Sequence, residues 1–235
     1  MMQVVILAGG LGTRLKPVTE EIPKSMVQIQ GKPFLEHQLN LLRRCGISDI
    51  VLCVGYLGEK IKDYFGDGKG FGVKIKYSEE TEKLLGTAGA LKNAVDLLDD
   101  TFFLTYGDAY LILDYRGAME YFKKFNKLGL MVVFKNFGRY DKSNVVVEGD
   151  LIKVYDKQKR APDMVYIDFG VSVLSKKALD LIPKGKAIDL EKLYHELIRR
   201  KELLAFETQQ RFYEVGSQNG LKEFERLISY GQVKI

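Results

Sequence analysis

The sequence predicts an α/β protein, with a mostly parallel central sheet flanked by helices and an α+β C-terminal half. First, strand-like and helix-like stretches alternate through residues 1–137, which is typical of parallel strands connected by helical crossovers. Second, the apolar run at residues 4–8 is hydrophobic enough for a strand buried on both faces. Third, the pattern changes beyond residue 138, where Glu148-Gly149-Asp150 is a hairpin signal. The first half is therefore expected to be Rossmann-like.

The elements can be placed in order from apolar periodicity and from glycine, proline and capping signals. In the first half we expect strands at 2–8, 49–54, 73–77, 101–106 and 130–136, and helices at 33–44, 58–65, 88–98 and 115–127. In the second half we expect strands at 144–147, 151–155 and 165–174, a helix at 190–200 capped by Asp189, and a helix at 218–229 capped by Ser217.

Length and composition indicate one globular domain, residues 1–235, with hydrophobic residues at 46% and charged residues at 29%. The longest apolar runs are much shorter than the roughly 20 residues that cross a bilayer, so neither a membrane span nor a signal peptide is expected. Cys45 and Cys53 are too few for a disulfide framework and are expected to be buried thiols. These features predict a cytoplasmic protein.

The net charge of +5 comes from 36 basic and 31 acidic residues that are spread along the chain. Nucleic-acid binding would need a concentrated basic patch, so we expect no nucleic-acid partner and no membrane partner. A small polyanionic substrate fits this modest excess of positive charge.

The segment 7–26 carries the most informative chemistry. Gly9, Gly10 and Gly12 follow the first strand and allow the backbone to approach a ligand closely and to direct N–H groups toward it. Arg14 adds a forked cation and Lys24 a mobile point charge. Together they predict a cradle for a triphosphate.

Two other glycine motifs fit this segment less well. The dinucleotide-binding fingerprint needs a glycine where Leu15 stands, and the P-loop needs Gly-Lys-Ser/Thr where Gly12-Thr13-Arg14 stands. A plain glycine turn with solvated basic residues would leave the joint presence of the loop and the downstream Pro23-Lys24 unexplained.

Segment 7–15, with Pro17, Thr19 and Pro23-Lys24, resembles the signature of the sugar-1-phosphate nucleotidyltransferases, the nucleoside-diphosphate-sugar pyrophosphorylases. The likeness continues at Gly31-Lys32-Pro33, Gly86-Thr87-Ala88, Gly107-Asp108 and Tyr155-Asp156-Lys157, and so covers nearly the whole chain. Within this family the short single-domain form looks most like the heptose-1-phosphate guanylyltransferase and muramic acid-1-phosphate uridylyltransferase branches.

The resemblance implies a GT-A-like nucleotide-diphospho-sugar transferase fold, in which residues 1–137 bind the nucleotide and residues 138–235 bind the sugar phosphate. It implies catalytic roles for Arg14, Lys24 and Asp108. The residues that it assigns to the nucleotide are Leu7, Ala8, Gly9, Gly10, Gly12, Thr13, Arg14, Gly86, Thr87 and Ala88. Thr87 could also be the N-cap of its own helix. The residues that it assigns to the sugar phosphate are Asp156, Lys157, Asp168 and Gly170.

Magnesium is the expected cofactor. Asp108 follows a predicted central strand, at the edge where open α/β sheets bind ligands, and a carboxylate there can hold Mg²⁺. The family places a second metal-binding aspartate late in the chain, where this sequence has Glu214. The longer side chain leaves three readings open: an adjusted backbone, an intervening water, or a purely structural glutamate.

The expected reaction is transfer of a nucleotidyl group from a nucleoside triphosphate to a sugar 1-phosphate, and family members are often homo-oligomers. The alternative is a non-catalytic nucleotide-sugar sensor or assembly subunit with the same fold, which Glu214 permits and which the joint presence of Lys24 and Asp108 disfavours. A dinucleotide-dependent oxidoreductase lacks its third glycine. His37 and His195 have no partner motif that would make them bases.

Overall fold

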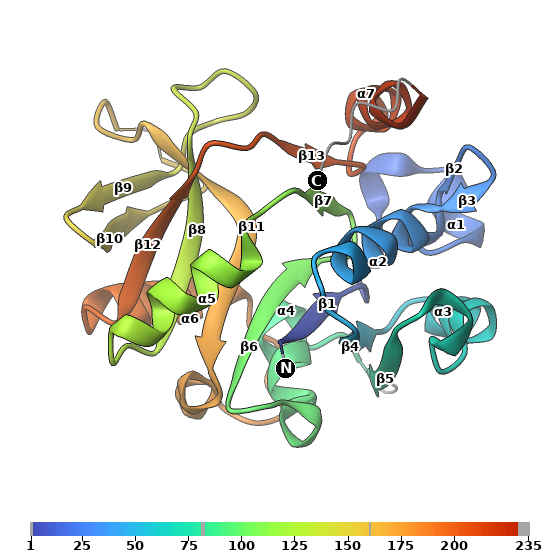
Figure 1. Ribbon diagram of the computed structural model, residues 1–235, viewed down its shortest axis with the longest axis horizontal. Coiled ribbons are helices and arrows are strands. Elements are labelled where there is room, and N and C mark those ends of the chain that lie inside the picture. The colour runs from blue at the N-terminus through green and yellow to red at the C-terminus, as the bar shows by residue number, and fades with distance from the viewer. Residues whose placement is uncertain (1, 81–82, 160, 230–235) are drawn as a thin grey trace.

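The computed structural model describes residues 2–80, 83–159 and 161–229. Within these residues nine strands form one sheet in the order β5-β4-β1-β6-β11-β8-β12-β10-β9. In Figure 1, β5 and β4 lie at one end of the molecule and the β9–β10 hairpin at the other. The strands are β1 (Gln3–Leu7), β4 (Asp49–Val54), β5 (Lys74–Glu79), β6 (Thr101–Tyr106), β8 (Gly129–Lys135), β9 (Val145–Glu148), β10 (Leu151–Tyr155), β11 (Tyr166–Ser175) and β12 (Leu203–Thr208).

The first four strands of this order pair in parallel, β5 with β4, β4 with β1 and β1 with β6. Helices connect them, because parallel neighbours need a crossover. The connecting helices are α1 (Val18–Glu21), α2 (Phe34–Arg44), α3 (Gly58–Phe65) and α4 (Gly86–Asn93). Three further helices follow β6 in the chain: α5 (Tyr115–Lys124), α6 (Leu190–Arg199) and α7 (Gln218–Ser229). This part of the sheet is the expected Rossmann-like half.

The other half of the sheet is mixed. β11 runs antiparallel to both β6 and β8, β12 runs parallel to β8, and β9 and β10 form the predicted hairpin. The predicted fold, a parallel sheet joined to an α+β half, is confirmed. β8 belongs to the first half of the chain, yet it lies between β11 and β12 of the second half.

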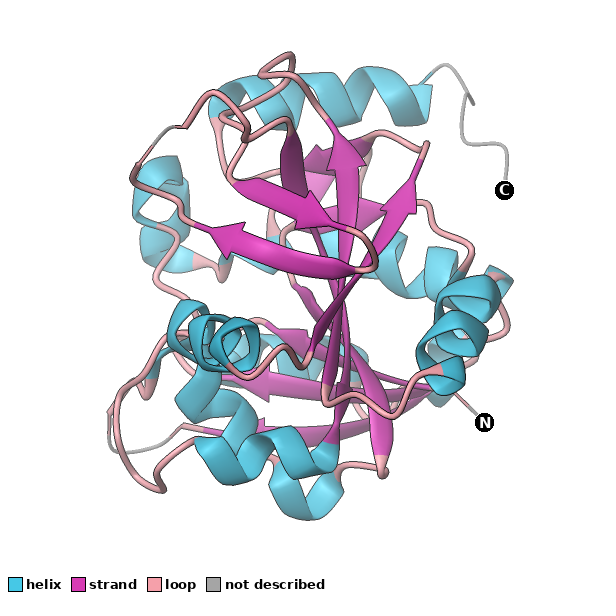
Figure 2. Ribbon diagram, turned by 90° about the vertical axis from the view of Figure 1, so that its left-hand side faces the viewer, coloured by secondary structure: helices cyan, strands magenta, loops and turns pink. Residues whose placement is uncertain are grey.

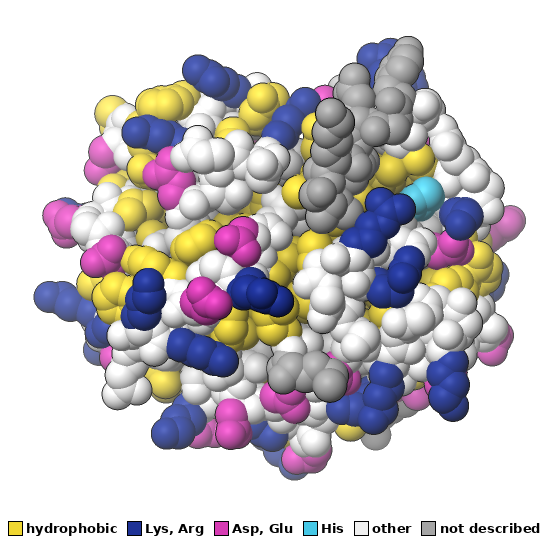
Figure 3. Space-filling view, in the orientation of Figure 1, with side chains coloured by type: hydrophobic (Ala, Val, Ile, Leu, Met, Phe, Trp, Pro, Cys, Tyr) yellow, Lys and Arg dark blue, Asp and Glu magenta, His cyan; other side chains and the backbone are white. Residues whose placement is uncertain are grey.

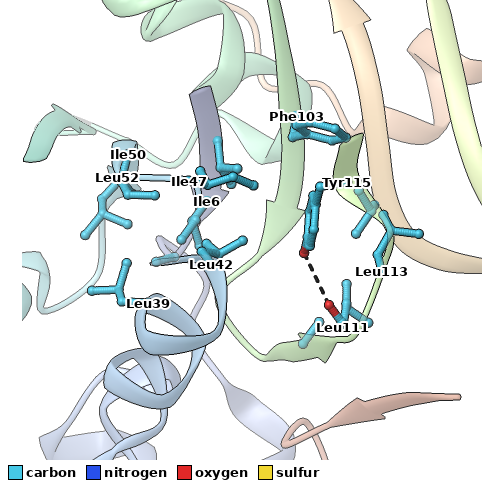
Figure 4. Close-up of a cluster of buried hydrophobic side chains, with 14 of the residues drawn as sticks. Ile6, Leu39, Leu42, Ile47, Ile50, Leu52, Phe103, Leu111, Leu113 and Tyr115 are labelled. Atoms are coloured by element: carbon cyan, nitrogen blue, oxygen red, sulfur yellow. Dashed lines mark hydrogen bonds between the residues drawn. The ribbon is translucent and has the colours of Figure 1, made fainter. Parts of the chain in front are cut away.

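Helices cover both faces of the sheet, as Figure 2 shows. Alternate residues of β1 point to opposite faces: Val4 and Ile6 pack on the α2 and α5 side, and Val5 packs on the α4 and α6 side. In Figure 4, Ile6 lies beside Leu39 and Leu42 of α2. The central strands are therefore mostly apolar on both faces, as a sheet covered on both sides requires.

Two short strands, β7 (Ala109–Leu111) and β13 (Phe212–Glu214), form an antiparallel ribbon outside the main sheet. The last helix, α7, covers this ribbon through Phe224, which contacts the rings of Phe34 and Tyr110 at centroid distances of 5.0 and 4.9 Å. The ribbon joins the segment after β6 to the C-terminal segment of the chain. A second short ribbon pairs β2 (Gln28–Ile29) with β3 (Lys32–Pro33).

Two predicted helices are shorter than expected. The helix predicted at 88–98 begins at Gly86, ends at Asn93 and is followed by a 3₁₀ turn at Val95–Leu97, which satisfies terminal carbonyl groups. The helix predicted at 115–127 ends at Lys124, because Phe125 takes an extended conformation.

No helix of the described residues is long and apolar enough to cross a membrane. Lysine and arginine side chains are interspersed with aspartate and glutamate over the face shown in Figure 3. This mixing agrees with the even spread of charge along the sequence.

Candidate active site

A cavity of about 360 Å³ opens at the carboxyl ends of β1, β4 and β6, beside the end of β5. This is the edge at which open α/β sheets bind ligands. Its lining is Leu7, Ala8, Gly9, Gly10, Gly12, Thr13, Arg14, Lys24, Ser25, Cys53, Glu80, Leu84, Gly86, Thr87, Ala90, Tyr106, Gly107, Asp108 and Asp189. Every predicted catalytic residue and nine of the ten predicted nucleotide-binding residues are in this lining; the exception is Ala88, which is buried behind it.

The glycine loop after β1 forms one wall of the cavity. Gly12 has a φ of +63°, and a Cβ atom there would lie 2.9 Å from Cγ2 of Thr19 and 3.2 Å from Cβ of Lys24. The Thr19 hydroxyl donates a hydrogen bond of 2.9 Å to the Gly12 carbonyl. Glycine is therefore required at position 12, and the turn brings Arg14 and Lys24 to the same cavity.

Lys24 and Asp108 meet in the cavity. The Lys24 ammonium group forms an ion pair with Oδ2 of Asp108, and the two side chains are 18% and 25% exposed. Asp108 lies two residues past β6, and Lys24 follows Pro23 in a 3₁₀ turn, Lys24–Met26. Both groups are thus positioned by backbone at the edge of the sheet, and they present a cation and an anion to a ligand.

Glu214 lies beside Asp108, although the two are far apart in sequence. Glu214 pairs with Ala109 in the β7–β13 ribbon, and the Val215 N–H group donates to the Asp108 carbonyl at 2.9 Å. The Glu214 carboxylate accepts hydrogen bonds from the Gly216 N–H group at 2.5 Å and from the Ser217 hydroxyl at 2.8 Å. These bonds fix its orientation.

Gly216 separates Glu214 from the basic residues of the cavity. A Cβ atom at Gly216 would collide with Oε2 of Glu214 and would lie 2.7 Å from Nζ of Lys24 and 2.8 Å from Nη2 of Arg14. Lys24, Arg14 and Glu214 therefore converge on one point, and only a residue without a side chain fits between them.

The donor set of Asp108 and Glu214 suits Mg²⁺, which takes one or two protein carboxylates together with substrate phosphates. Each Glu214 oxygen accepts one hydrogen bond and keeps a lone pair for a metal. Over residues 2–80, 83–159 and 161–229 no group of three or more His, Cys, Asp or Glu side chains could hold a metal. Substrate oxygens would therefore have to complete the coordination.

The loop before α4 is braced by the segment before α6. The N–H groups of Ala88 and Gly89 donate to the Ile188 carbonyl at 2.8 and 3.1 Å, and the Ile188 N–H group donates to the Leu85 carbonyl at 2.7 Å. The Thr87 hydroxyl accepts a 2.8 Å hydrogen bond from the Leu190 N–H group. The second half of the chain thus holds one wall of the cavity.

Two capping predictions are corrected by this brace. Thr87 lies inside the first turn of α4 and caps α6 through Leu190, because the two helix starts face each other. Asp189 occupies the N-cap position of α6 but makes no capping hydrogen bond, and it lines the cavity instead. The Ser217 cap is confirmed, since its hydroxyl accepts from the Gly220 N–H group at 3.0 Å.

The sequence interpretation missed two carboxylates in the cavity, Glu80 and Asp189. Glu80 immediately follows β5, so the strand-end rule that singled out Asp108 would have found it too. Asp189 was interpreted from the sequence as a helix cap, and that interpretation gave no reason to place it in the cavity lining.

The four predicted sugar-phosphate residues lie outside this cavity lining. Asp156 accepts hydrogen bonds of 2.8 Å from the N–H groups of Gln158 and Lys159, which lower its pKa and hold a local turn. The Lys157 ammonium lies 5.6 Å from the centre of the Tyr155 ring. Among the described residues, no hydrogen bond joins the side chain of Asp156 or Lys157 to a residue of the cavity lining.

Asp168 and Gly170 lie on β11, beside β6. Asp168 accepts hydrogen bonds from the Gly170 N–H group at 2.9 Å and from the Tyr155 hydroxyl at 3.1 Å. Burial raises the pKa of Asp168 against the lowering effect of Gly170 N–H and of the Lys157 charge. Burial also raises the pKa of Tyr106, and the charge of Asp168 adds to that shift. Tyr106 lines the cavity and lies beside β11, since a Cβ atom at Gly170 would be 4.0 Å from its Cδ2.

Comparisons with known proteins agree with this geometry. A family model described as nucleotidyl transferase matches residues 3–223. The D-glycero-α-D-manno-heptose 1-phosphate guanylyltransferase of Campylobacter jejuni is 34% identical over 92% of this chain and 95% of its own length. The UTP–glucose-1-phosphate uridylyltransferase of Synechocystis is 34% identical over 80% of this chain. That match covers 53% of the length of the uridylyltransferase.

Among solved structures, HddC from Yersinia pseudotuberculosis complexed with GMP-PN superimposes with a TM-score of 0.80 at 29% identity, covering 97% of this chain and 100% of HddC. The match of sequence and of fold extends over both halves of the chain. The chain therefore belongs to the nucleotidyl transferase family.

Proposed function

We propose that the protein transfers a nucleotidyl group from a nucleoside triphosphate to a sugar 1-phosphate, releasing pyrophosphate and a nucleoside-diphosphate sugar. The observation that carries this proposal is the convergence of the glycine loop, Arg14, Lys24 and Asp108 on one cavity at the edge of the sheet. The relatives that match the chain over most of their length, among them heptose-1-phosphate guanylyltransferases, support the same reaction class.

In this reaction an oxygen of the sugar 1-phosphate attacks the α-phosphorus in line. A new P–O bond forms as the bond to the pyrophosphate oxygen breaks, and pyrophosphate leaves with the electron pair. The attacking phosphate is already ionised, so no general base is needed. The protein's work is to align two anions and to offset their repulsion.

The residues divide this work by position. The backbone of residues 9–13 and the Arg14 guanidinium would hold the triphosphate, and Lys24 would stabilise the charge that develops at the α-phosphorus and on the leaving pyrophosphate. On binding, Lys24 would exchange part of its contact with Asp108 for phosphate oxygens. Asp108 would then be available as a ligand.

Magnesium is part of this proposal, with Asp108 and Glu214 as its protein ligands. Bound Mg²⁺ would neutralise charge on the phosphates. The Gly216 and Ser217 hydrogen bonds orient Glu214 toward the same region as Lys24 and Arg14, which supports a ligand role for the longer side chain.

We assign the incoming sugar phosphate to the second half of the chain, with Lys157 as its cation and Asp156, Asp168 and Gly170 around the sugar. This assignment follows the family resemblance. It is supported by the position of Gly170 beside the cavity, since a Cβ atom at Gly170 would lie 4.0 Å from Cδ2 of Tyr106, which lines the cavity.

The test is pyrophosphate release by the purified protein with Mg²⁺, over the four ribonucleoside triphosphates and dTTP and a panel of hexose and heptose 1-phosphates. Release that depends on one sugar phosphate and one nucleotide, and that falls in Glu214→Gln unless Mg²⁺ is raised, would support both the reaction and the metal ligand. Thermal stabilisation by a nucleotide sugar without turnover for any pair would favour the sensor alternative.

A further inference from the structure

The cavity has a polar end and an apolar end. Asp108 and Lys24 mark the polar end, beyond β6 and β1. At the other end Cys53, Leu84 and Ala90 form apolar walls. A nucleotide whose phosphates lie near Lys24 would place its flat base between these walls.

Glu80 lies at the apolar end beside Leu84, since a Cβ atom at Gly55 would be 3.0 Å from Cδ2 of Leu84 and 3.2 Å from Oε2 of Glu80. It immediately follows β5, and the sheet order β5-β4-β1-β6 sets three strand spacings between that strand and β6, which leads to Asp108. At about 4.8 Å per spacing, the two strand ends are roughly 14 Å apart. The backbones of Glu80 and Asp108 therefore start from opposite sides of the cavity.

One oxygen of Glu80 is already engaged and the other is available. Oε1 accepts a 2.6 Å hydrogen bond from the Leu85 N–H group. Oε2 lies close to the backbone of Gly9 and Gly55. A Cβ atom added at Gly9 would be 2.8 Å from Oε2, and one added at Gly55 would be 3.2 Å from it. Among the residues that the structure describes, none donates a hydrogen bond to Oε2.

A half-buried carboxylate without a cation partner needs hydrogen-bond donors, because an ionised carboxylate can only accept. Guanine places N1–H and N2–H side by side on its Watson–Crick edge. A carboxylate can accept both, because Oε2 is available and Oε1 keeps a second lone pair beside its bond from Leu85. Uracil and thymine flank their single N3–H with carbonyl oxygens. Adenine and cytosine place an unprotonated ring nitrogen next to their amino group.

We propose that Glu80 selects guanine by accepting hydrogen bonds from N1–H and N2–H, so that GTP is the nucleotidyl donor. This inference rests on the proposed nucleotidyl transfer for its nucleotide site. The hydrogen bond from the Leu85 N–H group fixes the orientation of the Glu80 carboxylate next to Gly86.

The test measures equilibrium dissociation constants of GTP and of inosine triphosphate, which lacks the 2-amino group, without any sugar phosphate present. The native protein should bind GTP at least about tenfold more tightly than inosine triphosphate and than UTP, CTP or ATP. In Glu80→Gln, GTP should bind about 10- to 100-fold more weakly, and the preference over inosine triphosphate should disappear.

Glu79→Gln is the matched control, since the neighbouring Glu79 carboxylate is exposed and pairs with Lys62 at 2.8 Å. It should leave both constants unchanged. The inference would be overturned by a native protein that does not distinguish GTP from inosine triphosphate, or by an equal weakening of both nucleotides in Glu80→Gln. The absence of a native preference for GTP would overturn the inference even if the variant does not fold.

Binding and turnover separate the two proposals. A preference for GTP over inosine triphosphate that depends on Glu80, without turnover of any sugar 1-phosphate, would support the guanine assignment and contradict nucleotidyl transfer. Turnover with UTP or dTTP in preference to GTP would support the transfer reaction and overturn the role of Glu80.

Discussion

Lys24 and Asp108, which are 84 residues apart in sequence, form an ion pair at the edge of the central sheet. Lys24 lies in the 3₁₀ turn that follows the glycine loop, and Asp108 lies in the turn that follows β6. Both side chains are less than a third exposed. This partly buried pair differs from an ordinary surface salt bridge, because it places opposite charges where an anionic substrate and a cation would both bind.

Replacing Lys24 by methionine should lower kcat by about 100- to 1000-fold, because a cation that stabilises developing charge contributes about 3 to 4 kcal/mol. Steady-state kinetics with the accepted substrate pair measures the effect. Lys62→Met, which removes a lysine from an exposed ion pair with Glu79, should retain the native rate. A Lys24→Met variant with unchanged kcat would exclude Lys24 from the chemistry.

Gly216→Ala should reduce kcat/KM by about 100-fold, since the added methyl group would displace Glu214, Lys24 or Arg14 by a substantial fraction of an ångström. Gly70→Ala is the control, because a Cβ atom there meets no atom within 4 Å. Kinetics of the two variants should therefore differ strongly. Equal activity of both would mean that the three side chains do not act together.

Thr87→Val should lower the free energy of unfolding by about 1 kcal/mol, because it removes the hydroxyl that accepts the Leu190 N–H at the start of α6. Thr87→Ser keeps that hydroxyl and should be close to the native protein. Urea unfolding measures both variants. Equal stability of the valine and serine variants would show that the hydrogen bond does not hold the two segments together.

Asp168→Asn should remove one contribution that lowers the free energy of unfolding as pH rises. Burial raises the pKa of Asp168 above its usual value of 3.8, so the native state retains a proton that the unfolded chain has lost. The native protein therefore loses stability as pH rises from near 3.8 through the raised pKa, and the neutral asparagine removes that loss.

The measurement is the difference between native and Asp168→Asn unfolding free energies across this pH range. The difference should shift in favour of the variant as pH rises. A difference that is constant with pH, or that shifts in favour of the native protein, would contradict a raised pKa at Asp168.

Local patterns in the sequence predicted most of the first half of the fold. β1, β4 and β6 are short continuous apolar runs, and their length and the glycines that follow β1, β4 and β6 identify them as strands. Gly46 ends α2, as a glycine after a helix should. The order of the strands after β6 was not predicted, because pairing of β11 with both β6 and β8 depends on contacts between distant parts of the chain.

The candidate site was predictable where it is local and unpredictable where it depends on tertiary contacts. The glycine loop with Arg14 and Lys24 is one continuous segment, so its residues could be recognised together. The position of Gly216 between Glu214 and the two cations depends on how the β7–β13 ribbon packs on the loop. Asp189 reaches the cavity only through the brace between the two halves.

The most direct test of nucleotidyl transfer uses the accepted nucleoside triphosphate labelled with ³²P at either the α or the γ position, with its sugar 1-phosphate and Mg²⁺. The account predicts that the α label enters the sugar product, that the γ label enters pyrophosphate, and that Asp108→Asn abolishes both. Transfer of the γ label to the sugar, or full activity in Asp108→Asn, would contradict it.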